Sequence, residues 1–519
     1  LFLLICSIWG WDTIFSPDNY IGKNTRDTYD HIALIDHWAV ESIDWNYPDG
    51  GTLLPPDLIA MILASPFFAF GVERGIAYDM AIVLQMWLNA LSGWFLGRRF
   101  GSAWIGGISL AFSPFILGQV NSGETETLVL WPLVFSLLNL WDRKWNWSGF
   151  WAAMTAIGSW YYGSYATIIV GMASLIALLK GDRKAIQAVV VMGLLLVVPI
   201  WNYIQFLTHS DQMFRGPSME SYIAEHPRAL ASFSSDLMAF FSTPAMDSNH
   251  VDSLGWVLLI FAILGFRRAS KKERLWIGLL LLGAMSLSLG PILHYKNAQV
   301  WDWMPYDLLM MVPPLNLMRL PHRWMAVASI ALAVFVIKGA KELPILATIL
   351  ILGDSLFFHV PRLHQTQITE PEIVDEFKGV VLELPTRTME HDSRGQYLVF
   401  QRGKDYKIPY SLLMQAFSPA LTEEPLVIAV TSMDSLDPIK ARSVEARQFR
   451  QEDFALAVAE WEPTEIKGAK TCLQAKGFTQ LCLHLDRLDD LDAKAIAAFL
   501  IESLGEPDLR STEALLWNL

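Results

Sequence analysis

The chain has 519 residues, of which 53% are hydrophobic and only 18% are charged, and its mean hydropathy is +0.33. Soluble globular proteins carry about 25% charged residues, so this composition argues against an ordinary soluble enzyme. A net charge of −13 also speaks against a nucleic-acid partner, because nucleic-acid binders show basic patches. The chain begins at Leu1 inside an apolar run, so we expect its natural start to lie further upstream.

The charge divides the chain into two expected domains. Residues 361–519 hold 17 Lys or Arg against 26 Asp or Glu and so carry −9 of the net charge. All the long apolar runs lie before this stretch. The pattern predicts a polytopic helical membrane domain at 1–360, with a long first outer loop at 16–76, and a soluble domain at 361–519.

About eleven apolar runs are candidate transmembrane helices, since a spanning helix needs about 20 mostly apolar residues. The stretch 53–72 contains three prolines and is expected to form a re-entrant or surface helix instead. A short break at Gly163 and Ser164 separates two of the runs, which could also be one long bent element. The eleven runs are 1–15, 77–97, 102–119, 127–141, 149–163, 165–180, 185–207, 252–266, 275–293, 324–338 and 343–358.

Basic residues predict the orientation of these helices. Five short loops hold 14 Lys or Arg, whereas the alternate loops are longer and richer in acids. The positive-inside rule then places the short loops in the cytoplasm and the longer loops and the tail outside. The five basic loops contain Arg98 and Arg99, Arg143 and Lys144, Lys180 to Lys184, Arg267 to Arg274, and Lys338 and Lys341.

The tail alternates strand-like and helical segments, which predicts a soluble α/β domain. The expected strands are 380–384, 397–400, 426–430, 480–485 and 514–519, with a helix over 490–504. Cys472 and Cys482 are either a disulfide in an oxidising compartment or two small buried hydrophobic residues.

Three polar clusters fall in the expected outer loops, where a membrane protein collects functional groups. Asp27, Asp30 and His31 follow the first span and offer a general base, a metal site or, alternatively, only a helix cap in a solvated loop. Glu124 and Glu126 lie in a tight turn, where they could bind a divalent cation or sugar hydroxyls, or simply favour a helix start.

The third cluster, Arg319, His322 and Arg323, precedes a span that is entered from outside. Arginine binds phosphate bidentately, so this cluster is a candidate for holding the phosphate of a lipid carrier. The alternative is that these side chains reach for the interface beside Trp324, which would act as a membrane-belt anchor.

The order of these features resembles the membrane-integral C-type glycosyltransferases (the GT-C superfamily), in particular bacterial members with an extracytoplasmic C-terminal domain. The likeness covers most of the chain and rests on order and composition. The segments that carry it are Arg26 to Tyr29, Pro55 and Pro56, Leu96 to Gly101, Ala111 to Pro114, Met318 to Trp324 and Val380 to Pro385.

This resemblance implies transfer of a hexosyl or pentosyl group from a polyprenyl-phosphate-linked donor to an acceptor glycan, lipid or protein on the outer face of the membrane. It also implies a bacterial inner (plasma) membrane, with the tail as a periplasmic domain of the cell envelope. By position, Asp27 would be the catalytic base or a metal ligand. Glu124 and Glu126 would complete a site for Mg²⁺ or Mn²⁺, which some members use and others do not. Asp30, His31, His322 and either Arg319 or Arg323 would bind substrate. Glu-x-Glu stands where metal-binding members more often have Asp-x-Asp.

Two other functions remain open from the sequence. A transporter or flippase of lipid-linked glycans would show internal repeats and mid-span charges, whereas mid-span charge is nearly limited to Asp79. A non-catalytic membrane scaffold would leave the three polar clusters scattered. Convergence of the clusters on one outward cavity therefore distinguishes the enzyme from the scaffold.

Overall fold

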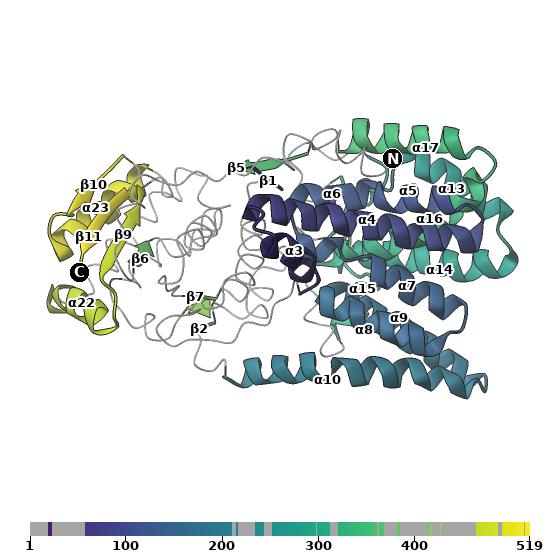
Figure 1. Ribbon diagram of the computed structural model, residues 1–519, viewed down its shortest axis with the longest axis horizontal. Helices are drawn as coiled ribbons and strands as arrows, with labels where there is room; N and C mark the ends of the chain where they lie inside the picture. Colours follow the sequence, from purple (N-terminus) through teal and green to yellow (C-terminus); the bar gives the residue numbers. More distant parts are fainter. Residues whose placement is uncertain are drawn as a thin grey trace. The chain divides into compact units, whose positions relative to one another are not determined.

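The computed structural model describes 19–22, 58–209, 214–215, 234–242, 252–296, 298–311, 320–360, 363–367, 381–384, 410–411, 416–417, 426, 463–485, 490–512 and 514–519. The chain divides into two compact units, which we describe separately (Figure 1). The first comprises 1–23, 55–202 and 217–366, and the second comprises 24–54, 203–216 and 367–519. The expected span 1–15 lies outside the described residues.

Helices dominate the described part of the first unit (Figure 1). Most of them coincide with an apolar run of the sequence, although several are shorter than a bilayer requires. In chain order they are α3 (Leu58–Ala69), α4 (Arg74–Phe100), α5 (Ala103–Ala111), α6 (Pro114–Ser122), α7 (Trp131–Trp141), α8 (Trp145–Gly158), α9 (Trp160–Leu179), α10 (Ile186–His209), α13 (Trp256–Arg268), α14 (Lys271–Ser288), α15 (Tyr306–Met310), α16 (Met325–Ala340) and α17 (Pro344–Gly353).

Four described helical segments are long and apolar enough to cross a membrane: Gly75–Phe100, Trp160–Leu179, Arg183–Trp201 and Pro321–Ala340. A fifth is obtained if α5 and α6, bent by 42° at their junction, form one span. The chain is therefore a largely helical protein with membrane-like apolar helices, and the count of eleven spans stays a prediction. Helix α3 has 12 residues, about 18 Å, which is less than the roughly 30 Å apolar core of a bilayer.

The expected break at Gly163 and Ser164 is wrong. The helix breaks at Ser159, whose backbone is extended (φ −159°, ψ 115°), and α9 continues through Gly163. A Cβ at Gly163 would overlap Ala156 of α8, so this glycine allows two helices to approach closely. Glycine is therefore required at this position for close helix packing and not for a turn.

Helix α16 forms the centre of the first unit. In the segment Pro321–Ala340, which contains α16, 94% of the apolar stretch is buried, whereas only 22% is buried in Arg183–Trp201, which contains most of α10. Glycines allow α16 to contact α13 at backbone distance. A Cβ at Gly265 would overlap the carbonyl oxygen of Phe335, and a Cβ at Gly339 would overlap that of Phe261. Small residues at helix crossings are a common way for membrane helices to associate, because they permit close van der Waals contact.

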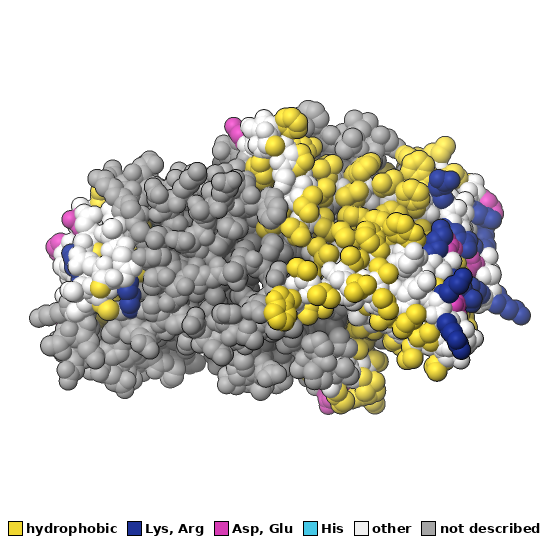
Figure 2. Space-filling model, turned by 60° about the horizontal axis from the view of Figure 1, so that its bottom comes forward, with side chains coloured by type: hydrophobic (Ala, Val, Ile, Leu, Met, Phe, Trp, Pro, Cys, Tyr) yellow, Lys and Arg dark blue, Asp and Glu magenta, His cyan; other side chains and the backbone are white. Residues whose placement is uncertain are grey.

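The five basic loops lie at one end of the helices. Arg99 pairs with Asp142 at 2.8 Å, and Lys272 lies over the ring of Trp141. Lys338 pairs with Glu273 at 2.9 Å. Figure 2 shows a broad apolar surface with Lys and Arg gathered at one end of it. This arrangement agrees with the charge segregation predicted from the sequence.

Strand β1 (Asn19–Ile21) pairs with β5 (Gln365–Gln367) at the junction between the helices and the tail. Asp79 of α4 accepts a hydrogen bond from the Ile21 amide at 2.9 Å. The backbone N–H of His364 donates to Asn121 of α6 at 2.5 Å. The backbone at Ile21 and at His364 is thus fixed to helices α4 and α6.

A four-stranded sheet with the order β10–β11–β9–β6 lies in the second unit. Strand β6 (Val381–Leu384) is parallel to β9 (Gln480–His484), and β11 (Ala514–Asn518) is antiparallel to β9. Strand β10 (Leu509–Arg510) completes the sheet, and helices α22 (Pro463–Ala475) and α23 (Asp490–Leu504) accompany it. Three predicted strands and the predicted helix are therefore present. The predicted strands 397–400 and 426–430 lie outside the described residues, except for Leu426.

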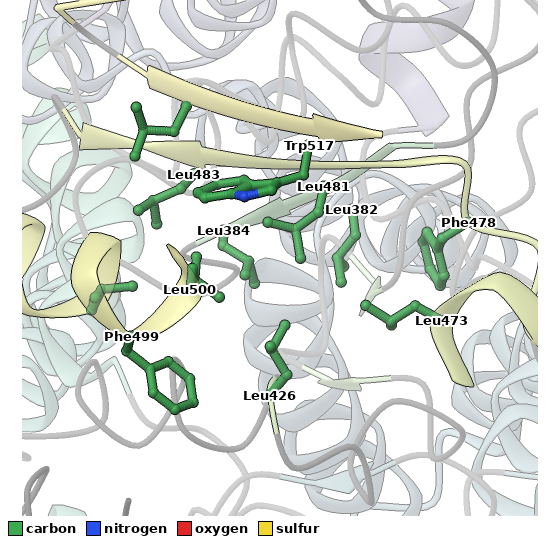
Figure 3. Packing of buried hydrophobic residues seen from close by; sticks show 12 residues of the cluster. Leu382, Leu384, Leu426, Leu473, Phe478, Leu481, Leu483, Phe499, Leu500 and Trp517 are labelled. Carbon is green, nitrogen blue, oxygen red and sulfur yellow. The ribbon is translucent and has the colours of Figure 1, made fainter. Parts of the chain in front are cut away.

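Leucine and aromatic side chains fill the core of this sheet (Figure 3). Leu481 and Leu483 of β9 and Trp517 of β11 pack with Leu500 of α23. Further along the second unit, β2 (Phe214–Arg215) pairs with β8 (Ala416–Phe417), which also pairs with β7 (Tyr410–Ser411). Cys482 is buried and Cys472 is exposed, and the two are not bonded to each other, so the disulfide alternative is wrong.

Candidate functional site

Two of the three predicted clusters meet at one place in the first unit. Arg323 donates through Nη1 to Oε1 of Glu126 at 2.5 Å and through Nη2 to Oε2 of Glu124 at 2.7 Å. We call these three residues the carboxylate–guanidinium cluster. Its side chains are 7% exposed at Arg323 and 13% and 14% exposed at the two glutamates. Almost 200 residues of sequence separate the partners, so only the tertiary fold brings them together.

The glutamates lie in a turn that follows α6. Gly123 ends α6 with a left-handed backbone (φ 74°), which glycine adopts without a Cβ penalty. The 3₁₀ segment η1 (Thr125–Leu128) comes next, with Glu124 before it. Glu124 stands at the N-cap position of this segment and Glu126 lies in its first turn, so the acids do lie at a helix start, as one interpretation predicted. Glu124 makes no side-chain capping bond there, and the Ser122 hydroxyl donates back to the Gln119 carbonyl.

Four buried side chains hold the Gly123–Leu128 turn by its backbone carbonyls. From α4, Tyr78 donates to the Gly123 oxygen at 2.6 Å, Gln85 to that of Thr125 at 3.1 Å, and Asn89 to that of Leu128 at 2.9 Å. From α9, the Tyr162 hydroxyl donates to the Thr127 oxygen at 2.8 Å. Polar side chains inside a membrane helix are costly, so these four hydrogen bonds indicate that the turn must be held at a fixed position.

The sequence analysis did not identify the three α4 residues that bond to the turn. Tyr78, Gln85 and Asn89 are seven and four residues apart, so they lie on one face of the helix. All three are at most 1% exposed. A polar stripe at helical spacing within an apolar span was the signal that could have revealed them.

Aromatic side chains surround Arg323 on its other sides. The guanidinium lies over the ring of Tyr161, with 4.4 Å between Cζ and the ring centroid. Trp324 stacks on Tyr165 at a centroid distance of 4.0 Å and is 3% exposed. Trp324 is therefore a buried packing residue, and the interpretation of this segment as a membrane-belt anchor is wrong. His322 is buried as well.

The 3₁₀ segment η5 (Pro321–Trp324) carries these residues into α16. Proline at its first position fixes φ and needs no hydrogen-bond acceptor there, which suits a helix start. Because α16 is the buried centre of the unit, η5 is held on a rigid element. The predicted site residues Asp27, Asp30, His31 and Arg319 lie outside the described residues.

The cluster lies at the end of the helices opposite to the basic loops. Arg323 lies just before α16, and the basic residue Lys338 in the last turn of α16 is 15 residues further along, a rise of about 22 Å.

The glutamate pair does not fit a divalent cation as it stands. Within the described residues, no group of three His, Cys, Asp or Glu side chains could hold a metal ion. One oxygen of each carboxylate already accepts a hydrogen bond from Arg323, whose positive charge lies where a cation shared by the two glutamates would lie. What the three residues can do is present a fixed, net negative polar surface.

Neither a protein-family model nor a curated protein matches this sequence. Among solved structures, the chain is similar to the Archaeoglobus fulgidus oligosaccharyltransferase, crystallised with Zn and sulfate. The TM-score is 0.41 with 11% identity, over 97% of this chain and 70% of that one. A likeness at this level does not by itself decide the fold or the activity.

Proposed function

We propose that the protein is a glycosyltransferase that moves a sugar from a polyprenyl-phosphate-linked donor to an acceptor on the outer face of a membrane. The carboxylate–guanidinium cluster is the observation that supports this most. Two polar segments singled out from the sequence meet there, at the end of α16 opposite to the basic residue Lys338. The positive-inside rule then puts the cluster on the extracytoplasmic side.

Each predicted residue has a role in this proposal. Asp27 takes the proton of the acceptor hydroxyl while the sugar C1–O bond breaks and the polyprenyl phosphate leaves. Arg319 and His322 stabilise the negative charge that develops on that phosphate. Arg323 is engaged by two carboxylates, so of the two arginines Arg319 is the better candidate for the phosphate. Asp30 and His31 bind the acceptor.

Glu124 and Glu126 orient sugar hydroxyls with the oxygen positions that Arg323 leaves open. A carboxylate has about four lone-pair sites, so one bond to Arg323 leaves others for a substrate. The four side-chain hydrogen bonds from α4 and α9 to the Gly123–Leu128 turn support such a positioning role. No step of this mechanism passes through a metal ion.

A scaffold function is less well supported, since a scaffold gives no reason for Glu124, Glu126 and Arg323 to converge. A flippase predicts charges along the translocation path. The one acidic side chain buried within α4, Asp79, is instead bonded to the Ile21 amide.

The direct test is donor consumption by the purified full-length protein in nanodiscs. Polyprenyl-phosphate-linked hexoses and pentoses are supplied one at a time with an extract of envelope glycans and lipids. The expected result is release of polyprenyl phosphate with one donor, and loss of that release in Asp27→Asn. Unchanged turnover in Asp27→Asn would remove the assigned role, and equal donor stability with and without protein across the panel would contradict the proposed function.

A further inference from the structure

We propose that the guanidinium of Arg323 acts as the counter-ion of Glu124 and Glu126 and takes the place of a divalent cation. This inference deepens the proposed function, because it concerns the cofactor requirement of the same site. It departs from the metal ligation that the sequence pattern of two neighbouring acids suggested. The two contacts of Arg323, at 2.5 and 2.7 Å, carry it.

The shape of the guanidinium suits this position. Arginine presents its N–H donors in a planar fork, so one side chain can bridge two carboxylates. Arg323 uses one terminal nitrogen for each glutamate. Charge-assisted hydrogen bonds of this kind are short and roughly twice as strong as those between neutral groups.

The surroundings hold Arg323 in place. Its side chain is 7% exposed, and the Tyr161 ring covers the guanidinium at 4.4 Å. The pair is fixed from the other direction, because Tyr78, Gln85, Asn89 and Tyr162 bind the carbonyls of the turn. Neither partner can move away without breaking buried contacts.

A divalent cation would compete with Arg323 for the same two carboxylates. Even a cation coordinated by the second oxygen of each carboxylate would lie next to the guanidinium, which places two cationic groups side by side in a buried site. The repulsion between them is only weakly screened at such a position. Arg323 therefore lowers the affinity of the pair for Mg²⁺ or Mn²⁺.

Mn²⁺ binding to the full-length protein tests this directly, by the loss of the free-Mn²⁺ EPR signal on titration. The wild type and the double variant Glu124→Gln/Glu126→Gln are expected to bind equal amounts of Mn²⁺. Arg323→Met is expected to bind an additional Mn²⁺, and this gain should disappear in the triple variant that also carries both Gln substitutions. Arg99→Met is the matched control, since it removes an arginine from the opposite end of the helices, and it should show no gain.

A wild-type protein that binds one Mn²⁺ more than the double Gln variant would overturn the proposal. A folded Arg323→Met protein that binds no more Mn²⁺ than the wild type would overturn it too. If Arg323→Met does not fold, the comparison of wild type with the double Gln variant still decides. The titration uses no sugar donor, so its outcome is independent of whether the transfer assay succeeds.

Discussion

The amide nitrogen of Asn89, in the middle of helix α4, donates to the carbonyl oxygen of Leu128 at 2.9 Å. Asn89 is fully buried, and the bond reaches from an apolar helix to the end of the turn that carries Glu124 and Glu126. A hydrophobic residue at this position would suit the membrane better. The bond therefore identifies Asn89 as a residue that positions the turn.

Replacing Asn89 with Leu should lower the free energy of unfolding by about 1–2 kcal/mol, because the buried Leu128 carbonyl loses its donor. Thermal unfolding of the detergent-purified protein measures this. Asn139→Leu is the matched control, since the Asn139 amide bonds the Phe135 carbonyl within its own helix, and its effect should stay within about 0.5 kcal/mol. Equal losses in the two variants would contradict a positioning role for Asn89.

Arg323→Met should destabilise the protein by about 3–5 kcal/mol, because it leaves two buried carboxylates without their shared counter-ion. Adding Glu124→Gln and Glu126→Gln to this variant should restore part of the loss. Arg99→Met removes a partly exposed ion pair with Asp142 and should cost only about 0–1 kcal/mol. Chemical or thermal unfolding curves of the four proteins test the ranking, and a similar cost for Arg99→Met and Arg323→Met would contradict it.

Gly265→Ala should separate α13 from α16, because the added methyl group overlaps the Phe335 carbonyl. Overpacking of this kind costs about 1–3 kcal/mol. Gly283→Ala in α14 is the control, since open space surrounds that position and the substitution should stabilise the helix by about 0.5–1 kcal/mol. The prediction fails if thermal unfolding shows the same sign of change for both variants.

Glu273 provides a pH-dependent contribution at the basic end. Burial would raise the pKa of Glu273, but hydrogen bonds from Lys338 and Ser270 outweigh it and lower the pKa below its usual value. A carboxylate with a depressed pKa stabilises the folded state above its unfolded pKa, and this contribution is lost as the pH falls through the folded value. Glu273→Gln should therefore lower the melting temperature near pH 7 and make progressively less difference below about pH 4.

The control for Glu273→Gln is Ser270→Ala. Ser270 and Glu273 form a capping box at the start of α14, so removing the serine hydroxyl should cost about 1 kcal/mol. The part of this loss that comes from the Glu273 amide, which donates to the Ser270 hydroxyl, should persist at low pH, whereas the part that comes from the hydroxyl's bond to the Glu273 carboxylate should disappear as that carboxylate is protonated. A pH-independent effect of Glu273→Gln would show that its charge contributes nothing.

The sequence predicted the structure best where the pattern of residues within a single helix or strand determines that element. The run 77–97 became α4, because it holds a single charged side chain, Asp79, before Arg98 and Arg99. Residues 490–504 became α23 with the predicted bounds. The break near Gly163 was misplaced because a glycine serves equally in a turn and in a close helix contact, and only the neighbouring Ala156 distinguishes the two.

The candidate site was less predictable, because its contacts join distant segments. The residue types at Glu124, Glu126 and Arg323 marked each of them as functional, but nothing in their local spacing indicated that they pair. The partners of Arg323 were predicted to be phosphate and those of the glutamates to be a cation. Two opposite charges that meet in the fold satisfy each other first, and a single sequence does not reveal such a pairing.

The division of the chain into two units also has a topological consequence. The second unit gathers 24–54 and 203–216 together with 367–519, so the polypeptide crosses between the units five times. Strand β8, near the middle of the C-terminal stretch, takes its partner β2 from the segment after α10. A chain truncated before residue 367 would therefore lack β8, the partner of β2, and a fragment that starts there would lack β2. The two units cannot be separated by a single cut in the chain.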